Sequence, residues 1–309
     1  MSKANYSKVG GQAIMEGVMM RSPEKTVMSV RTPDKSITTE EVRFPNVRQK
    51  YKFLSIPIIR GMVAFAESLI LGFKTISRSA SLSGLEEETD GNKTLETIVL
   101  VVSFIFGLGL SLALFVFIPV GLRVGIETLF KFSFGPLRTL FEGVVKIGIF
   151  LLYMVLIAQM KDIKRLFQYH GAEHKTIFCY EAGEELTVEN VRKHSRFHPR
   201  CGTSFIFVVM LISILFFAIF SGFPNGVYTI LKVLLLPVVA GLSFEVTQFT
   251  ARHDNLCTRV LSAPGKWIQH ISTNEPDDDQ IEVAIASMKG ALGMIEVNPP
   301  YEEQEQAEK

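Results

Sequence analysis

The longest uncharged stretch of the chain constrains its fold most. From Thr97 to Leu122 the sequence has no ionisable residue for 26 positions. About 20 consecutive apolar residues are enough for a helix to cross the hydrocarbon core of a bilayer. The 309 residues are 48% hydrophobic, and the apolar ones are gathered in blocks of this kind. The sequence therefore predicts an all-α integral membrane protein.

Further apolar blocks predict three more membrane helices. Gly143–Met160 carries one charge, Lys146, which we expect close enough to the start for its amine to reach toward the interface. The uncharged run Cys201–Leu231 spans 31 residues, too long for one helix, and has turn chemistry at Gly222–Gly226. It divides into helices over Ser204–Gly222 and Val227–Phe249. We expect about four transmembrane helices, paired over 97–160 and 204–249.

Basic residues predict how these helices are oriented. Three lie between the first two helices and none between the last two, whereas eight lie between Lys161 and Ser204. The eight are Lys161, Lys164, Arg165, Lys175, Arg192, Lys193, Arg196 and Arg200. Cytoplasmic loops carry the excess of Lys and Arg, so we expect a cytoplasmic His-rich loop at 161–203 and both termini in the cytoplasm. Topology alone explains these charges, and no nucleic-acid partner is expected.

The regions outside the membrane helices predict smaller elements. Residues 1–52 contain short apolar runs separated by Ser-Pro and Pro-Asp turns, which predicts a small N-terminal β element. Residues 53–80 predict an amphipathic helix that is interfacial or re-entrant, because Arg60 and Glu67 would be costly at full membrane depth. Residues 250–298 predict a cytoplasmic helical region, and 299–309 a disordered acidic tail.

The motif that carries chemistry lies in the basic loop. Residues 170–174 read His-Gly-Ala-Glu-His, the H-x-x-E-H order found in inverted zinc proteases. On a helix, His170 and His174 are about one turn apart, so both imidazoles can face one metal ion. Glu173 lies beside them and is the candidate catalytic base. A motif with three fixed positions also arises by chance, so it needs further ligands nearby.

Three other side chains are candidate ligands. His198 and Cys201 are three residues apart at the start of the third predicted helix, a spacing suited to zinc. Glu245 is a carboxylate in an apolar helix, which is expensive unless it is coordinated or paired. Alternatively, Glu245 forms an ion pair with Arg252 or Lys161, and Cys201 is only a small residue at a helix start. Cys179, Cys201 and Cys257 all fall on the predicted cytoplasmic side and are read as thiols or ligands rather than disulfides.

Five segments together resemble one known family. They are Gly10–Arg21, His170–Thr176, Glu184–Val191, His198–Ser204 and Glu275–Ile285. They are similar, nearly end to end, to the YqhQ-like family of bacterial multi-pass membrane proteins. Members of that family are labelled predicted metal-dependent enzymes. The resemblance implies a metal role for His170, Glu173, His174, His198 and Cys201, and leaves the reaction open.

Three functions are compatible with this reading. The first is a hydrolase that depends on zinc or another divalent transition metal and acts on a lipid or membrane peptide at the cytoplasmic face. The second is a non-enzymatic membrane scaffold or transporter-associated factor, whose metal would be structural and held by four protein ligands. Ion transport ranks last, because Lys146, Lys232 and Glu245 are the charges expected within the helices, all near helix ends.

Overall fold

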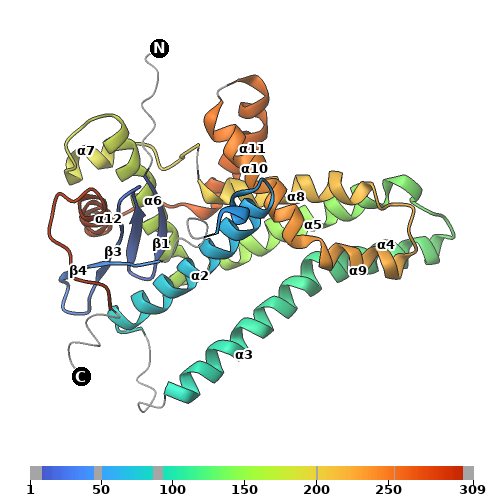
Figure 1. The fold of residues 1–309 in the computed structure, drawn as a ribbon, viewed down its shortest axis with the longest axis horizontal. Coiled ribbons are helices and arrows are strands. Elements are labelled where there is room, and N and C mark those ends of the chain that lie inside the picture. Colours follow the sequence, from blue (N-terminus) through green and yellow to red (C-terminus); the bar gives the residue numbers. More distant parts are fainter. Residues whose placement is uncertain (1–8, 45–50, 86–92, 200, 254, 302–309) are drawn as a thin grey trace.

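A small antiparallel sheet forms the N-terminal part of the structure, a computed structural model that describes residues 9–44, 51–85, 93–199, 201–253 and 255–301 (Figure 1). Its strands are β1 (Gly10–Ile14), β2 (Gly17–Arg21), β3 (Thr26–Arg31) and β4 (Ile37–Glu41), in the order β1-β2-β3-β4. Glu16, with a φ of 48°, lies in the tight turn between β1 and β2. The predicted β element is confirmed.

Both faces of this sheet are covered by helices. Successive residues of a strand point to opposite faces. Val18 and Met20 of β2 accordingly pack in a core that includes residues of α6 (Lys161–Glu181) and α12 (Asp278–Ala291). Met19 packs on the other face with Leu71 of α2 (Ile59–Leu82). The predicted loop at 161–203 is thus largely helical and is joined to the sheet in one folded unit.

Most of the remaining helices lie on the other side of the molecule, where they form a bundle from which the first of them, α3, extends away (Figure 1). They are α3 (Lys93–Leu112), the π-helical η2 (Ala113–Phe117), α4 (Ile118–Phe130), α5 (Arg138–Ile157), α8 (Gly202–Ala218), α9 (Asn225–Leu234), α10 (Leu236–Arg252) and α11 (Leu256–Ser272). Short elements complete the chain, namely η1 (Lys52–Ser55), η3 (Gly135–Leu137) and α7 (Val188–Lys193). The fold is mostly helical, as predicted.

The number of membrane helices is smaller than the sequence suggested. In the described part of the chain, two helices are long and apolar enough to cross a membrane, Val101–Phe130 and Gly135–Ile157. The third predicted helix, α8, has 17 residues, and at about 1.5 Å per residue it falls short of the hydrocarbon thickness. The fourth is broken, because α9 and α10 meet at an angle of 55°. Counting that bent pair as one gives up to three spans.

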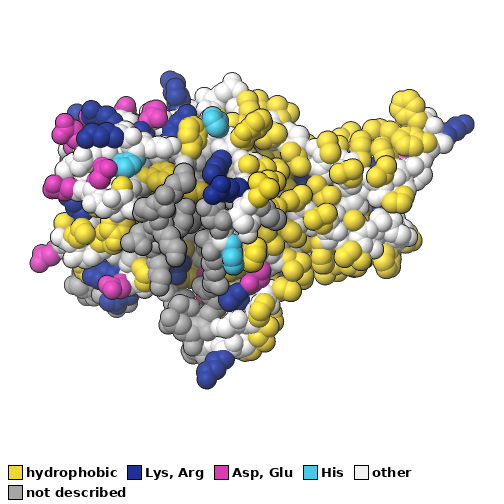
Figure 2. All heavy atoms as spheres, turned by 90° about the horizontal axis from the view of Figure 1, so that it is seen from above, with side chains coloured by type: hydrophobic (Ala, Val, Ile, Leu, Met, Phe, Trp, Pro, Cys, Tyr) yellow, Lys and Arg dark blue, Asp and Glu magenta, His cyan; other side chains and the backbone are white. Residues whose placement is uncertain are grey.

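The two halves of the molecule differ in surface chemistry. In Figure 2 apolar side chains cover the helical bundle, whereas most charged side chains gather over the part that contains the sheet. Exposed Phe104, Phe106 and Leu152 belong to the apolar surface. An apolar belt of this kind is consistent with a membrane protein.

Helix α2 connects the two halves. Its N-terminal part packs on α10, where a β-carbon at Gly61 would lie 2.5 Å from the carbonyl oxygen of Gly241. Its C-terminal part packs on the sheet through Leu71 and Ile76. The helix is not among the candidate membrane spans in the described residues.

Candidate metal centre

The motif residues lie on one buried turn of α6. His174 is 1% exposed and Glu173 is 5% exposed. Gly171 is the residue that lets this turn approach its neighbour, because a β-carbon there would lie 2.0 Å from the carbonyl oxygen of Asn274. The glycine inside His-Gly-Ala-Glu-His therefore has a packing role.

Three predicted ligands come together. The Nε2 atom of His170 lies 3.2 Å from the Sγ atom of Cys201, and the rings of His170 and His174 are 4.4 Å apart. One donor atom from each of the three residues lies within 4.8 Å of the others. Ligands of a tetrahedral site with metal bonds of about 2.0–2.3 Å lie roughly 3.3–3.8 Å from one another. The three side chains can approach that geometry with small movements.

Backbone carbonyl groups orient both imidazoles. The Nδ1 atom of His170 lies 2.8 Å from the carbonyl oxygen of Ser272, and Nδ1 of His174 lies 2.5 Å from that of Arg196. A carbonyl oxygen accepts only, so each Nδ1 carries the proton and each Nε2 keeps a lone pair. Ligating histidines commonly have such a carbonyl partner. Burial lowers the pKa of His174, which favours the neutral imidazole that a metal requires.

Cys201 occupies the start of α8. Its sulfur accepts a hydrogen bond from the backbone N–H of Thr203 at 3.5 Å and lies 3.2 Å from the hydroxyl oxygen of the same residue. The alternative reading, a small residue at a helix start, describes its position correctly. Its sulfur nonetheless faces the two histidines.

His198 lies next to this group without joining it. Its ring is 5.6 Å from the ring of His174 and 4.5 Å from that of Phe178, and its Nε2 is 3.6 Å from a carboxylate oxygen of Glu181. Fully buried Gln269 holds its backbone, accepting from the N–H at 2.8 Å and donating to the carbonyl oxygen at 2.8 Å. These two hydrogen bonds hold the backbone of the segment that leads to Cys201.

Glu245 is located elsewhere. Both of its carboxylate oxygens are bound by the guanidinium of Arg60 on α2, one of them at 3.1 Å from Nε. It is absent from the ligand groups found among the described residues. A carboxylate in an apolar helix is expected to be paired or coordinated, and in the structure Arg60 is a partner of Glu245. The side chain of Arg252, one of the partners expected from the sequence, lies outside the described residues.

Glu173 lies beside the three donors and outside their group. Strand β1 covers it so closely that a β-carbon at Gly11 would be 2.7 Å from its Cγ. Burial raises the pKa of Glu173 to about 7, while the nearby imidazole of His170 and a hydrogen bond from the Gly11 backbone act in the opposite direction. A carboxyl group of this kind can both accept and release a proton near neutral pH.

The group opens onto a large cavity. Its volume is about 1080 Å³, and His170, Glu173, His174, His198 and Cys201 contribute to its wall. Much of the remaining wall is apolar, with Leu69 and Phe73 from α2, Phe104 from α3 and Ile206 from α8. The cavity thus extends from the candidate ligands toward helices of the apolar half.

Several contributors carry no sequence signature. Ser272 and Arg196 act through backbone oxygens, so their side chains give no hint of the role. Gln269 is an ordinary polar residue in a helix. The sequence showed Gly11 only as part of Gly10–Arg21, a segment of the predicted β element and of the family resemblance. Its contact with Glu173 depends on the pairing of β1 with α6 in space.

Comparison with known proteins places the chain in a family. Residues 56–294 match the model described as "Protein of unknown function (DUF1385)". The chain belongs to this family. It is also 35% identical over 299 residues to the protein called "Uncharacterized protein YqhQ" of Bacillus subtilis (strain 168), covering 92% of each chain. The resemblance noted in the sequence is thereby confirmed. No solved structure matches.

Proposed function

We propose that the protein is a metal-dependent hydrolase of the membrane surface, with zinc or a similar divalent transition metal held by His170, His174 and Cys201. The observation that carries the proposal is the orientation of both imidazoles. Each imidazole donates its Nδ1–H to a backbone carbonyl, which leaves Nε2 for the metal. The Sγ atom of Cys201 lies 3.2 Å from Nε2 of His170, close to the separation of two ligands of one metal ion. Two nitrogens and one sulfur are typical zinc donors, and three protein ligands leave one position open.

Glu173 is the proposed catalytic base. When bound, the metal would supply Lewis-acid chemistry and lower the pKa of a water molecule. The carboxylate of Glu173 would accept the proton from that water and return it to the leaving group. Its burial and the Gly11 backbone hold it beside the ligands without making it one. A pKa of about 7 suits a group that must both accept and donate.

The cavity favours an amphiphilic substrate. A volume of about 1080 Å³ with an apolar wall accommodates an acyl or isoprenoid chain, or an extended apolar peptide. Phe104 and Ile206 belong to helices of the apolar half, so such a substrate would reach the ligands from the bilayer. In our proposal this opening lies at the cytoplasmic face, which the excess of Lys and Arg between Lys161 and Ser204 supports.

His198 favours a second candidate, a scaffold whose metal is structural. Its ring lies 5.6 Å from that of His174, so a rotation could make it a fourth protein ligand. Four protein ligands would leave no position for water. In that case the metal would only fasten α6 to the segment before α8.

X-ray absorption spectroscopy on the purified full-length protein, loaded with zinc, distinguishes the hydrolase from the scaffold. The hydrolase predicts one sulfur, two imidazoles and one light atom that exchanges when a hydroxamate inhibitor is added. The scaffold predicts one sulfur and three imidazoles, with no change on adding the inhibitor. A spectrum that lacks sulfur, or protein that takes up no transition metal, would overturn the assignment of the site.

A further inference from the structure

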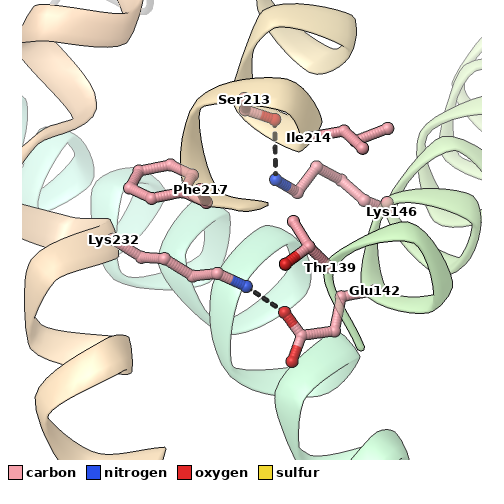
Figure 3. Close-up of a pocket in the computed structure, with 8 residues that line it drawn as sticks. Thr139, Glu142, Lys146, Ser213, Ile214, Phe217 and Lys232 are labelled. Atoms are coloured by element: carbon pink, nitrogen blue, oxygen red, sulfur yellow. Dashed lines mark hydrogen bonds and ion pairs between the residues drawn. The ribbon is translucent and has the colours of Figure 1, made fainter. Parts of the chain in front are cut away.

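Charged side chains are gathered inside the helical bundle, and Figure 3 shows Glu142, Lys146 and Lys232 among them. Arg123 and Glu127 come from α4, Arg138, Glu142 and Lys146 from α5, and Lys232 from α9. The side chains of Arg123 and Glu142 are 1% and 2% exposed. Charges so deep in an apolar bundle are expensive, and in membrane proteins they mark ligand or ion sites.

Glu142 is fully occupied by two of the cations. One of its carboxylate oxygens accepts from Nε of Arg123 at 2.7 Å, and the other accepts from the ammonium of Lys232. Arg123 also binds Glu127, and it donates to the side-chain oxygen of Asn225 at 2.9 Å. Both carboxylates of the group are thus already neutralised by Arg123 and Lys232.

Lys146 is left with a hydroxyl partner. Its ammonium donates to Oγ of Ser213 on α8 at 3.2 Å, and among the described residues no carboxylate lies within ion-pair distance. Lys146 is eight residues from the start of α5, or about 12 Å along a helix of twenty residues. The expected extension of this amine toward the interface is therefore wrong, because the side chain points inward from the middle of α5.

Arg138 is the fourth cation, and among the described residues it too forms no ion pair with a carboxylate. It donates to the carbonyl oxygens of Phe220 and Phe223 and lies 4.0 Å from the ring centre of Tyr228. Four cations and two carboxylates leave the group with an excess of two positive charges. Uncompensated charge in a medium of low dielectric constant is unfavourable, so a negative partner would be stabilised there.

A small cavity lies where such a partner would bind. Its volume is about 10 Å³, room for one water-sized occupant. Lys146, Lys232, Ser213, Thr139 and Glu142 line it with polar groups, and Ile214 and Phe217 with apolar ones. The carboxylate of Glu142 is already bound by Arg123 and Lys232, so its negative charge is compensated at this wall. Figure 3 shows both ammonium groups pointing into the space between α5, α8 and α9.

The surrounding helices are irregular at this place. The π-helical η2 packs against both α5 and α9, and π-helical turns often occur at functional sites. The bend of 55° between α9 and α10 follows Lys232 by three residues. Broken helices are characteristic of ion sites near the middle of a membrane.

We propose that this cavity binds a small monovalent anion of halide size, held by the ammonium groups of Lys146 and Lys232 and by the hydroxyl of Ser213, which would turn from the carbonyl oxygen of Met210 to donate to the anion. The anion connects α5, α8 and α9 in the middle of the bundle. From the sequence, ion transport ranked last because the charges within the helices were expected near helix ends. Lys146 instead lies in the middle of α5. The proposal is independent of the metal centre.

Radiolabelled chloride tests it by equilibrium dialysis of the full-length protein in neutral detergent, with gluconate replacing chloride as the balancing ion. The wild-type chain should bind about one chloride in a saturable manner, since the cavity holds one occupant. Lys146→Met, which keeps the length and removes the charge, should weaken binding at least about tenfold, and Ser213→Ala about threefold. Chloride should also raise the thermal midpoint, whereas gluconate, which is too large, should not.

Two controls give the result its meaning. Lys131→Met removes a cation from the exposed end of α4 and should bind chloride as the wild type does. The variant His170→Ala with His174→Ala should also retain chloride, which separates this site from the metal centre. Absence of saturable chloride binding to the wild-type chain would overturn the proposal, as would unchanged binding in both Lys146→Met and Ser213→Ala. If Lys146→Met does not fold, Ser213→Ala decides.

Discussion

Gly11 of β1 lies directly against the carboxyl group of Glu173, so that a β-carbon at residue 11 would be 2.7 Å from Cγ and 2.9 Å from Oε1. The N-terminal sheet thereby forms one wall of the candidate site. It keeps Glu173 buried and limits its rotation, although β1 and α6 are about 160 residues apart in the chain. The base and the ligands are thus positioned by different elements.

Replacing Glu173 with Gln separates its proposed role from that of a ligand. Gln is nearly isosteric and cannot accept the proton, so we expect activity in a complementation assay to fall by a factor on the order of 10²–10⁴ while metal content stays the same. Glu185→Gln, on the exposed surface, is the matched control and should behave as the wild type. Full complementation by Glu173→Gln would exclude the base, and loss of metal would make Glu173 a ligand.

The double variant His170→Ala with His174→Ala should lose most of its bound metal. Two of the three proposed donors are removed, and one thiolate alone holds zinc too weakly to survive purification. Metal analysis of the detergent-purified protein measures the effect. His253→Ala, at the exposed end of α10, should keep the wild-type metal content. Stoichiometric metal in the double variant would place the site elsewhere.

Gly171→Ala tests whether the close approach of α6 to Asn274 is required. The added methyl group would collide with a carbonyl oxygen, because its carbon would lie 2.0 Å away. Overpacking of this kind costs about 1–3 kcal/mol, so the thermal midpoint should fall by several degrees and metal affinity with it. Gly148→Ala is the control, since a β-carbon there meets nothing within 4 Å. Equal midpoints for the two variants would contradict the packing role.

The sequence revealed the parts of the site that lie close together in the chain. The helical period places His170 and His174 on one face, and the apolar run after Cys201 marks the helix that this residue begins. The carbonyl partners of the imidazoles have no side-chain pattern, so they could not be predicted. The ion pair of Glu245 with Arg60 was not predicted, because the two residues are 185 positions apart in the chain. Only the packing of α2 on α10 brings the two together.

The bends of the membrane helices and the ion pairs between them could not be predicted from the sequence either. Hydropathy located every apolar block, but it does not report bends. The break between α9 and α10 falls within a continuous apolar run, where only Pro237, at the start of α10, hints at a helix boundary. Glu142 lies just before the expected start of the second helix, and Arg123 just after the expected end of the first. The ion pair of Arg123 with Glu142 inside the bundle could therefore not be predicted from hydropathy.

Glu245→Gln should keep its bound metal and lose stability, unlike the double variant of the metal centre, which should lose its metal. Its carboxylate is bound by Arg60 and lies outside the group formed by His170, His174 and Cys201, so metal content should remain at the wild-type level. Stability should fall instead, because Arg60 loses its ionic partner at the contact between α2 and α10. In a double-mutant cycle, Arg60→Ala and Glu245→Ala should show a coupling of about 1 kcal/mol, since both side chains are partly exposed. Additive effects would mean that the ion pair does not form, and a loss of metal in Glu245→Gln would restore this carboxylate as a ligand.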